Sequence, residues 1–215
     1  MGTKTLRFML VSVAVLALML GGCRKQPTAS SPTNGLPAGE VPQLADYPDQ
    51  GLNLKQYING MEKAGHNVVM WKDPSVDTSA LADRPIYVDE IDARFVPKID
   101  GYPHTPYSTM VKSTLRDTIK ASKQKKPNAI LVKGSLVEVN YGSKAARFLV
   151  GLGAGKASGG VVIEAFLPGK SKPFLRLYGR ETASGGLFGG DSVALMNHIF
   201  TRNALQVGGV IDSAI

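Results

Sequence analysis

The hydrophobic positions beyond residue 50 recur with the period of a helix in three stretches. They cover 52–61, 107–124 and the C-terminal residues from 191 onward, so the pattern predicts three helices. Gly65 follows the first stretch and is its expected stop, because glycine commonly ends helices. Asp191 precedes the last stretch and is expected to cap the first turn of that helix.

Strand-like patterns occupy much of the sequence between these helices. Residues 84–97 predict a strand whose apolar positions change parity at Asp89–Glu90, which indicates a β-bulge. Residues 129–139 predict the next strand, with an irregularity at Gly134–Ser135. Residues 160–181 predict a hairpin, because two apolar runs flank a turn rich in Pro, Gly and Lys.

The order of the main elements is strand, helix, strand, strand, strand and helix. This order predicts an α+β fold, a mostly antiparallel sheet with helices packed on it. We expect the folded domain to cover 51–215. Residues 23–50 hold five prolines among Ser, Thr, Gly and Asn, with little apolar content, so they predict a disordered tether.

The first 22 residues have the organisation of a secretory signal peptide. Lys4 and Arg7 precede an apolar run over 8–20, and its 13 residues are too few to span a bilayer comfortably. The run ends in Leu20-Gly21-Gly22-Cys23, which resembles the bacterial lipobox. We therefore expect residues 1–22 to be a lipoprotein signal peptide.

Cys23 is the only cysteine of the chain, which excludes an internal disulfide framework and a cysteine-rich zinc site. The lipobox resemblance implies cleavage between Gly22 and Cys23, a diacylglycerol on the thiol and a further acyl chain, such as palmitate, on the freed amine. Two or three acyl chains hold a protein firmly on a membrane. By the same resemblance, Arg24 favours transfer to the periplasmic face of the cell outer membrane.

The formal net charge is +8 and falls to +6 once Lys4 and Arg7 are removed with the signal peptide. Most of this excess comes from one stretch, which has Lys133 at its end. Its other basic residues are Lys112, Arg116, Lys120, Lys123, Lys125 and Lys126. They form either a solvated helix face or a contact for an anionic surface. Nucleic acid is not an expected partner of an exported chain without an aromatic and basic platform.

Nucleotide-binding and zinc motifs are not met by the spacing of the sequence. The stretch 151–160 fails the phosphate-loop pattern, because Val150 and Ala157 stand where that pattern requires Gly and Ser or Thr. The three histidines lack the spacing of a zinc site. They are His66, His104 and His198. We expect no metal and no cofactor besides the covalent lipid.

One acidic group is a candidate for hydrolytic chemistry. Asp89, Glu90 and Asp92 could supply a carboxylate pair for glycoside hydrolysis, and a solvated strand edge is the alternative. No nucleophile stands in a recognised motif. We therefore predict no catalytic residues and no enzymatic activity.

The glycine-rich stretch 151–160 predicts an exposed connection that leads into the hairpin. Apolar residues beside the glycines suit docking onto a partner or a membrane, and a plain flexible loop is the alternative. The candidate docking loop consists of Phe148, Leu149, Val150, Gly151, Leu152, Gly153 and Gly155.

The segments Leu131–Ser135 and Ala146–Ala157, followed by the hairpin, resemble a bacterial lipoprotein family that carries domain of unknown function 4410. More distantly, the glycine-rich run before a hairpin is similar to the periplasmic domain of the curli-secretion lipoprotein. The first resemblance supplies no catalytic residues, because that family has no assigned activity. The second implies oligomeric, pore-associated work.

We expect a non-enzymatic lipoprotein of the cell envelope, attached to the membrane by its lipid anchor. Its periplasm-facing domain would bind or assemble with other envelope proteins, or self-associate. The alternative is an accessory or pore-associated subunit of a secretion or transport system.

Overall fold

The computed structural model describes residues 41–98, 104–142, 156–184 and 191–215. The predicted cleavage and lipidation sites, Gly22 and Cys23, lie outside these residues. The predicted docking loop, 148–155, also lies outside them. Within the described residues, no helix is both long enough and apolar enough to cross a bilayer.

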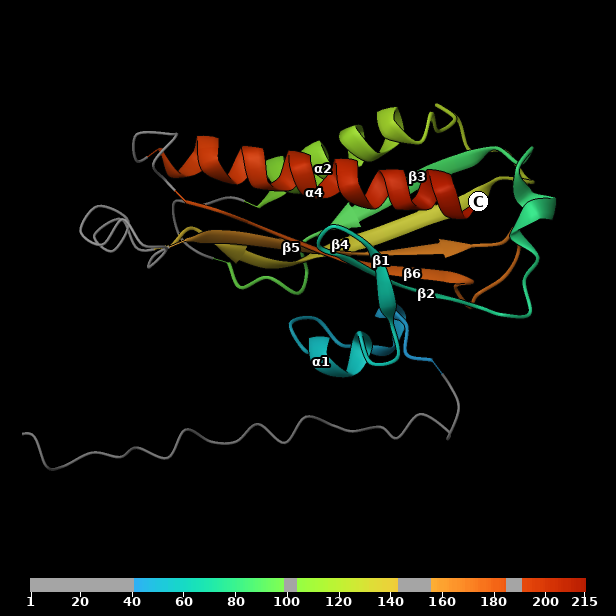
Figure 1. Ribbon diagram of the computed structural model, residues 1–215, viewed down its shortest axis with the longest axis horizontal. Helices are drawn as coiled ribbons and strands as arrows, with labels where there is room; N and C mark the ends of the chain where they lie inside the picture. The colour runs from blue at the N-terminus through green and yellow to red at the C-terminus, as the bar shows by residue number, and fades with distance from the viewer. Residues whose placement is uncertain (1–40, 99–103, 143–155, 185–190) are drawn as a thin grey trace, which may run out of the picture. The chain divides into compact units, whose positions relative to one another are not determined.

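Six strands form one sheet in the order β1-β2-β6-β5-β4-β3 (Figure 1). The strands are β1 (Glu62–Gly65), β2 (Val68–Lys72), β3 (Ile86–Asp92), β4 (Ile130–Asn140), β5 (Ala157–Phe166) and β6 (Leu175–Ala183). Only the β3–β4 pair is parallel, and the other neighbouring strands are antiparallel. The predicted α+β fold with a mostly antiparallel sheet is confirmed.

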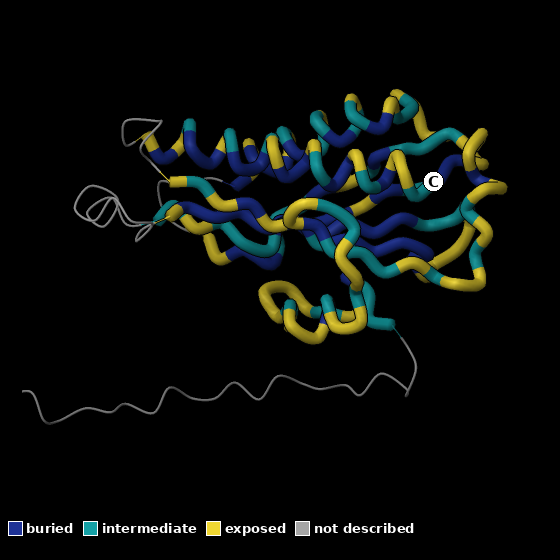
Figure 2. The backbone as a smooth tube through the Cα atoms, viewed as in Figure 1, coloured by how far each residue is buried: buried dark blue, intermediate teal, exposed yellow. Residues whose placement is uncertain are grey.

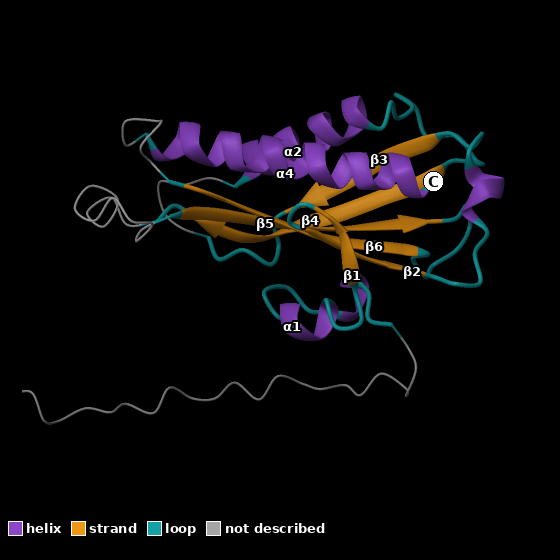
Figure 3. Cartoon of the chain, viewed as in Figure 1, coloured by secondary structure: helices purple, strands orange, loops and turns teal. Residues whose placement is uncertain are grey.

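Helices cover the two faces of the sheet unequally (Figure 3). The long helices α2 (Thr105–Thr118) and α4 (Ser192–Ala214) pack side by side on one face. On the opposite face lie the short helix α1 (Leu54–Tyr57) and the 3-10 helix η1 (Leu44–Asp46). A second 3-10 helix, η2 (Thr78–Leu81), lies in the connection from β2 to β3.

Several local predictions are confirmed. The register of β3 against β4 shifts between Val88 and Ile91, where the change of parity predicts a bulge. The hairpin is formed by β5 and β6. The Asp191 side chain caps α4 by accepting hydrogen bonds from the backbone N–H groups of Val193 and Ala194.

Other local predictions are wrong in position or extent. The predicted helix over 52–61 is helical only at Leu54–Tyr57, and Gly65 ends strand β1 instead of that helix. The irregularity expected at Gly134–Ser135 lies between Leu136 and Glu138, where the register of β4 against β5 shifts. The sheet also contains two strands beyond those in the predicted order, β1 and β2, because the short run after residue 67 pairs with β6.

The main hydrophobic core lies between the sheet and the two long helices (Figure 2). Its fully buried side chains include Leu115 of α2, Leu177 of β6 and Phe200 of α4. Asn203 of α4 is also fully buried here and donates hydrogen bonds to the carbonyls of Gly159 and Gly179. A Cβ at Gly179 would collide with the Asn203 side chain, so this close approach requires glycine.

Residues 157–160 correct the prediction of an exposed connection over 151–160. They belong to β5 and are all buried. A Cβ at Gly159 would lie 2.8 Å from Ile199 and 2.9 Å from Phe200. Gly159 therefore serves the close packing of α4 on the sheet, and this end of the run does not form a surface loop.

A second, smaller core covers the opposite face of the sheet. Its buried members are Leu44, Tyr57, Phe95 and Val162. Leu44 is 6% exposed although the sequence pattern places it in the tether. Residues 42–47, named here the junction segment, thus pack on the domain, although its predicted start is at 51.

Candidate functional site

A buried pair of opposite charges lies under the junction segment. Glu164 of β5 and Arg176 of β6 are directly opposite each other in the β-ladder. They are 2% and 1% exposed. Charged side chains are rarely buried to this extent unless hydrogen bonds satisfy them. The hydrogen bonds of Glu164 and Arg176 therefore indicate which segments of the chain the pair holds in place.

Both charged groups bind the backbone of the N-terminal part of the domain. The Glu164 Oε1 atom accepts hydrogen bonds from the Leu44 N–H at 2.7 Å and from the Tyr57 hydroxyl at 3.1 Å. The Arg176 guanidinium donates to the carbonyl oxygens of Pro42 and Tyr57. The pair thereby fastens the junction segment and the end of α1 to the middle of the sheet.

Two aromatic rings complete the surroundings of Arg176. Its guanidinium carbon lies 5.0 Å from the ring centre of Tyr57 and 5.0 Å from that of Trp71. Cation–π contacts of this kind are stronger where water is excluded. Burial lowers the pKa of Arg176, while the neighbouring Tyr57 and Glu164 raise it. The guanidinium is thus held by carbonyls and rings.

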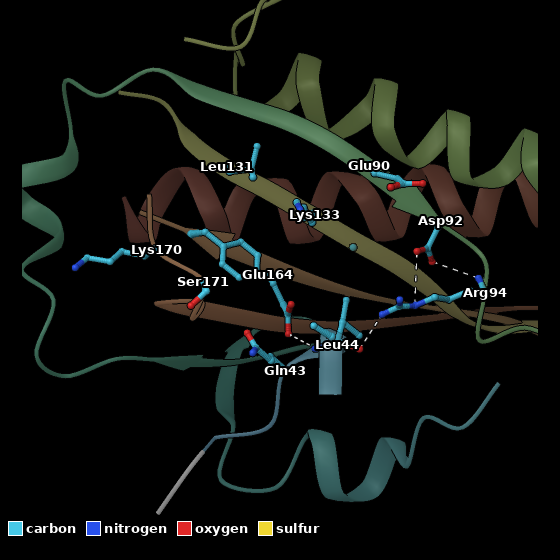
Figure 4. Close-up of a pocket in the computed structure, with 13 residues that line it drawn as sticks. Gln43, Leu44, Glu90, Asp92, Arg94, Leu131, Lys133, Glu164, Lys170 and Ser171 are labelled. Atoms are coloured by element: carbon cyan, nitrogen blue, oxygen red, sulfur yellow. Dashed lines mark hydrogen bonds and ion pairs between the residues drawn. The ribbon is translucent and has the colours of Figure 1, made fainter. Parts of the chain in front are cut away.

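A pocket of about 380 Å³ opens beside Glu164 (Figure 4). Leu131 and Phe166 contribute apolar surface to its lining. Its other members come from β3 and the residues just after it, from β4, from β5, from the junction segment and from the turn after β5. The charged lining residues are Glu90, Asp92, Arg94, Lys133, Glu164 and Lys170. A pocket with both apolar surface and charges of both signs suits a ligand of mixed polarity.

Burial raises the pKa of the Glu164 carboxyl from 4.5 to about 7. The hydrogen bonds from Leu44 and Tyr57 and the charge of Arg176 oppose this effect and lower the pKa. Burial also raises the pKa of the Tyr57 hydroxyl, so this group stays protonated and can donate to Glu164. A pKa this far above the usual value of a glutamate reflects how strongly burial disfavours the charged form of the carboxyl.

Two of the three predicted carboxylate candidates reach this pocket. Glu90 and Asp92 line it, whereas Asp89 does not. Asp92 forms an ion pair with Arg94 at 3.7 Å. Arg94 in turn donates to the Leu44 carbonyl at 2.7 Å, so this ion pair also holds the junction segment.

The remaining predicted site residues lie elsewhere. Lys112 and Arg116 are half-buried on α2, and the lysines from 120 to 126 are exposed in the connection to β4. His104 is buried with its Nε2 atom 2.9 Å from the Pro97 carbonyl. Among the described residues, no group of three or more His, Cys, Asp or Glu side chains could hold a metal ion.

Sequence reasoning missed Glu164 and Arg176 as a pair, although a pattern that points to them is present. Glu164 is the single charged residue of the first strand of the predicted hairpin, and Arg176 stands between two leucines in the second strand. They also stand at equal distances from the hairpin turn, so antiparallel pairing places them opposite each other. What no local pattern shows is that the junction segment covers them.

Comparisons with known proteins bear on part of this architecture. No curated protein matches the chain. The PelC dodecamer from Paraburkholderia phytofirmans is similar with 13% identity and a TM-score of 0.43, covering 68% of this chain and 97% of that chain. A chain from Caulobacter crescentus described as a lipoprotein is similar with 12% identity and a TM-score of 0.35, covering 63% and 88%.

Residues 108–166 match the family described as a domain of unknown function, DUF4410. The matched stretch runs from α2 through β4 to the end of β5. It begins before the segments that first suggest the resemblance and ends before β6. The resemblance of this chain to the domain of unknown function 4410 family is therefore confirmed over residues 108–166.

Proposed function

We propose that this chain is a lipid-anchored lipoprotein of the bacterial envelope whose domain binds another envelope component without catalysing a reaction. The anchor part of the proposal rests on the sequence Leu20-Gly21-Gly22-Cys23 behind a short apolar run. The binding part rests on the pocket beside Glu164. In this proposal the anchor is in the outer membrane and the domain faces the periplasm.

The position of the pocket supports a link between anchoring and binding. Gln43, Leu44 and Ala45 of the junction segment form part of its lining. The same segment connects the domain to the tether that follows Cys23. A ligand in the pocket would thus contact the segment through which the anchor holds the domain.

The hydrogen bonds of Glu164 support a binding role over a catalytic one. Its Oε1 atom already accepts from Leu44 and Tyr57, and these contacts hold the fold together. A general acid or base has to reach the reacting group of its substrate at hydrogen-bond distance. We therefore propose that no hydrolytic activity resides here. One reproducible turnover that is lost on Glu164→Gln or Glu90→Gln would overturn this part.

Lipidation is tested by replacing Cys23 with Ser in the full chain. We expect the wild type to incorporate labelled fatty acid and to fractionate with membranes at high salt. The variant should lose both properties, because the thiol is the attachment atom. A variant that keeps the label and stays membrane-bound would contradict the anchor.

Binding is tested by affinity capture from crosslinked envelopes with two matched variants. Lys133→Glu reverses a charge inside the pocket, and Lys63→Glu reverses one on the exposed edge strand β1. We expect captured partners to be lost with Lys133→Glu and kept with Lys63→Glu. Equal capture by both variants would show that the pocket is not the binding site.

The alternative, a pore-associated subunit of a transport system, requires a closed oligomer. A native-mass measurement on the mature chain separates the two functions. A discrete ring of many copies favours the alternative, and a monomer at micromolar concentration excludes it.

A further inference from the structure

One end of the sheet collects basic side chains from three separate segments. We name this surface the basic end. It consists of Arg84, Lys120, Lys123, Lys125, Lys126 and Lys170, all exposed. These residues come from the start of β3, the connection between α2 and β4, and the turn between β5 and β6.

Backbone pairing places these segments together. The Ser122 N–H donates to the Ile86 carbonyl at 2.7 Å, and the Ile130 N–H donates to the Pro85 carbonyl at 2.8 Å. Both bonds hold the connection after α2 against the start of β3. Leu131 pairs with Phe166, which brings the β5–β6 turn to the same end of the sheet.

The acids around the basic end do not neutralise it. Residues 118–137 contain five lysines and no acid. Asp83 precedes Arg84, and Asp73 and Asp77 lie in the connection after β2. Asp117 lies in the last turn of α2, three residues before Lys120. Hydrogen bonds from Ser75 and Ser79 lower the pKa of Asp73 and Asp77, so both carboxyls keep their negative charge. The six cations of the basic end still outnumber these four acids, so a positive excess remains exposed at this end.

Lys120 has a backbone conformation that favours glycine. Its φ angle is +47°, in the left-handed region, directly after the C-terminal residues of α2. A glycine at this position would end the helix without steric cost, whereas other residues pay about 1 kcal/mol. The chain nevertheless has an exposed cation here, and it is part of the basic end.

The proposed anchor keeps this surface near a membrane. The 17 residues from 24 to 40 can span at most about 60 Å when fully extended. A tether of this length gives a second, weak contact a high effective concentration. Clustered lysines contact anionic headgroups favourably, and each lysine near the surface adds to the attraction.

We propose that the basic end contacts the anionic lipid headgroups of the membrane that carries the anchor. This rests on the proposed function for the anchor, but the contact itself depends only on the charges of the folded domain. The contact would set which side of the domain faces the bilayer. Lys170 belongs to both the basic end and the lining of the pocket, so the contact would bring that wall of the pocket to the membrane surface.

The test uses the mature chain with Cys23→Ser, so that no acyl chain contributes. Its partition is measured onto vesicles of phosphatidylcholine alone and of phosphatidylcholine with one third phosphatidylglycerol. The test variant carries Lys123→Gln, Lys125→Gln and Lys126→Gln. The control carries Lys55→Gln, Lys63→Gln and Lys98→Gln, which remove the same charge from exposed positions outside the basic end. Thermal melts of both variants should match the parent chain.

We expect binding only to the anionic vesicles, reduced roughly 100-fold in the test variant and clearly less in the control. Salt at 0.5 M should abolish the binding. Equal partition of the two variants, or equal binding to both kinds of vesicle, would overturn the proposal. Binding to soluble dextran sulfate without vesicle binding would also overturn it and would identify a soluble polyanion as the partner. None of these results depends on whether Cys23 is acylated.

Discussion

Glu164→Gln replaces a buried carboxyl by a neutral group of the same shape. Burial raises the pKa of Glu164 from 4.5 to about 7 in the folded chain. The folded state therefore binds this proton more tightly than the unfolded state does. The stabilisation is complete below pH 4.5 and is lost as the pH rises through 7. A shift of this size corresponds to about 3 kcal/mol, at 1.36 kcal/mol per pKa unit.

The assay is urea unfolding of the mature wild type and of Glu164→Gln between pH 4.5 and 8.5. The informative quantity is the difference between their free energies of unfolding, because other carboxyl groups then cancel. This matters because hydrogen bonds lower the pKa of Glu138 and Asp73, which act in the opposite direction. As the pH rises through this range, we expect the free energy of unfolding of the variant to increase relative to that of the wild type by up to about 3 kcal/mol. The exposed Glu62→Gln is the control.

The opposite outcome would refute this reasoning. If the wild type became more stable than Glu164→Gln as the pH rises, the charge of Arg176 would dominate over burial. Glu164 would then be a permanently charged partner of Arg176, and its proton would play no part near neutral pH.

Three further predictions concern the stability of the domain. Gly209→Ala should stabilise the domain by about 0.5–1 kcal/mol, because the added Cβ meets open space on α4. Gly208→Ala should destabilise it, because the added Cβ would lie 2.8 Å from Thr118. Thermal melts of the two variants beside the wild type check both signs. Asp191→Ala should cost about 1 kcal/mol by removing the cap of α4, measured by urea unfolding, and an unchanged midpoint would contradict it. Leu44→Ala should lower the free energy of unfolding by about 2–5 kcal/mol, because the Leu44 side chain is buried in the folded unit. A loss below about 0.5 kcal/mol would show that the junction segment belongs to the tether.

Sequence patterns predicted those elements whose cause is local. The parity change at Asp89–Glu90 marks the bulge, and the position of Asp191 marks a helix start, because neighbouring residues alone determine both. The prediction of a helix over 52–61 was wrong in extent because the structure there does not have a local cause. Its apolar residues face a sheet that no local pattern reveals, so Tyr57 packs on the sheet and the chain turns into β1.

The candidate site depends on contacts that are distant in sequence. Leu44 and Glu164 are 120 residues apart, and Pro42 and Arg176 are 134 apart. The proline content around residue 42 is typical of a tether, yet its carbonyl satisfies a buried guanidinium. Composition predicts how a segment behaves alone. Here the segment packs on a buried charge pair that lies far away in the sequence, and its own composition gives no sign of that contact.

Asn203 fixes the position of α4 on the sheet. Its amide nitrogen lies 3.2 Å from the Gly159 carbonyl oxygen and 3.0 Å from the Gly179 carbonyl oxygen, so it joins one helix to two neighbouring strands. Sliding or rolling of α4 by one residue would break both bonds inside a dry core. We therefore expect α4 to keep a fixed position relative to β5 and β6. Those strands carry Glu164 and Arg176, which hold the junction segment on the other side of the sheet.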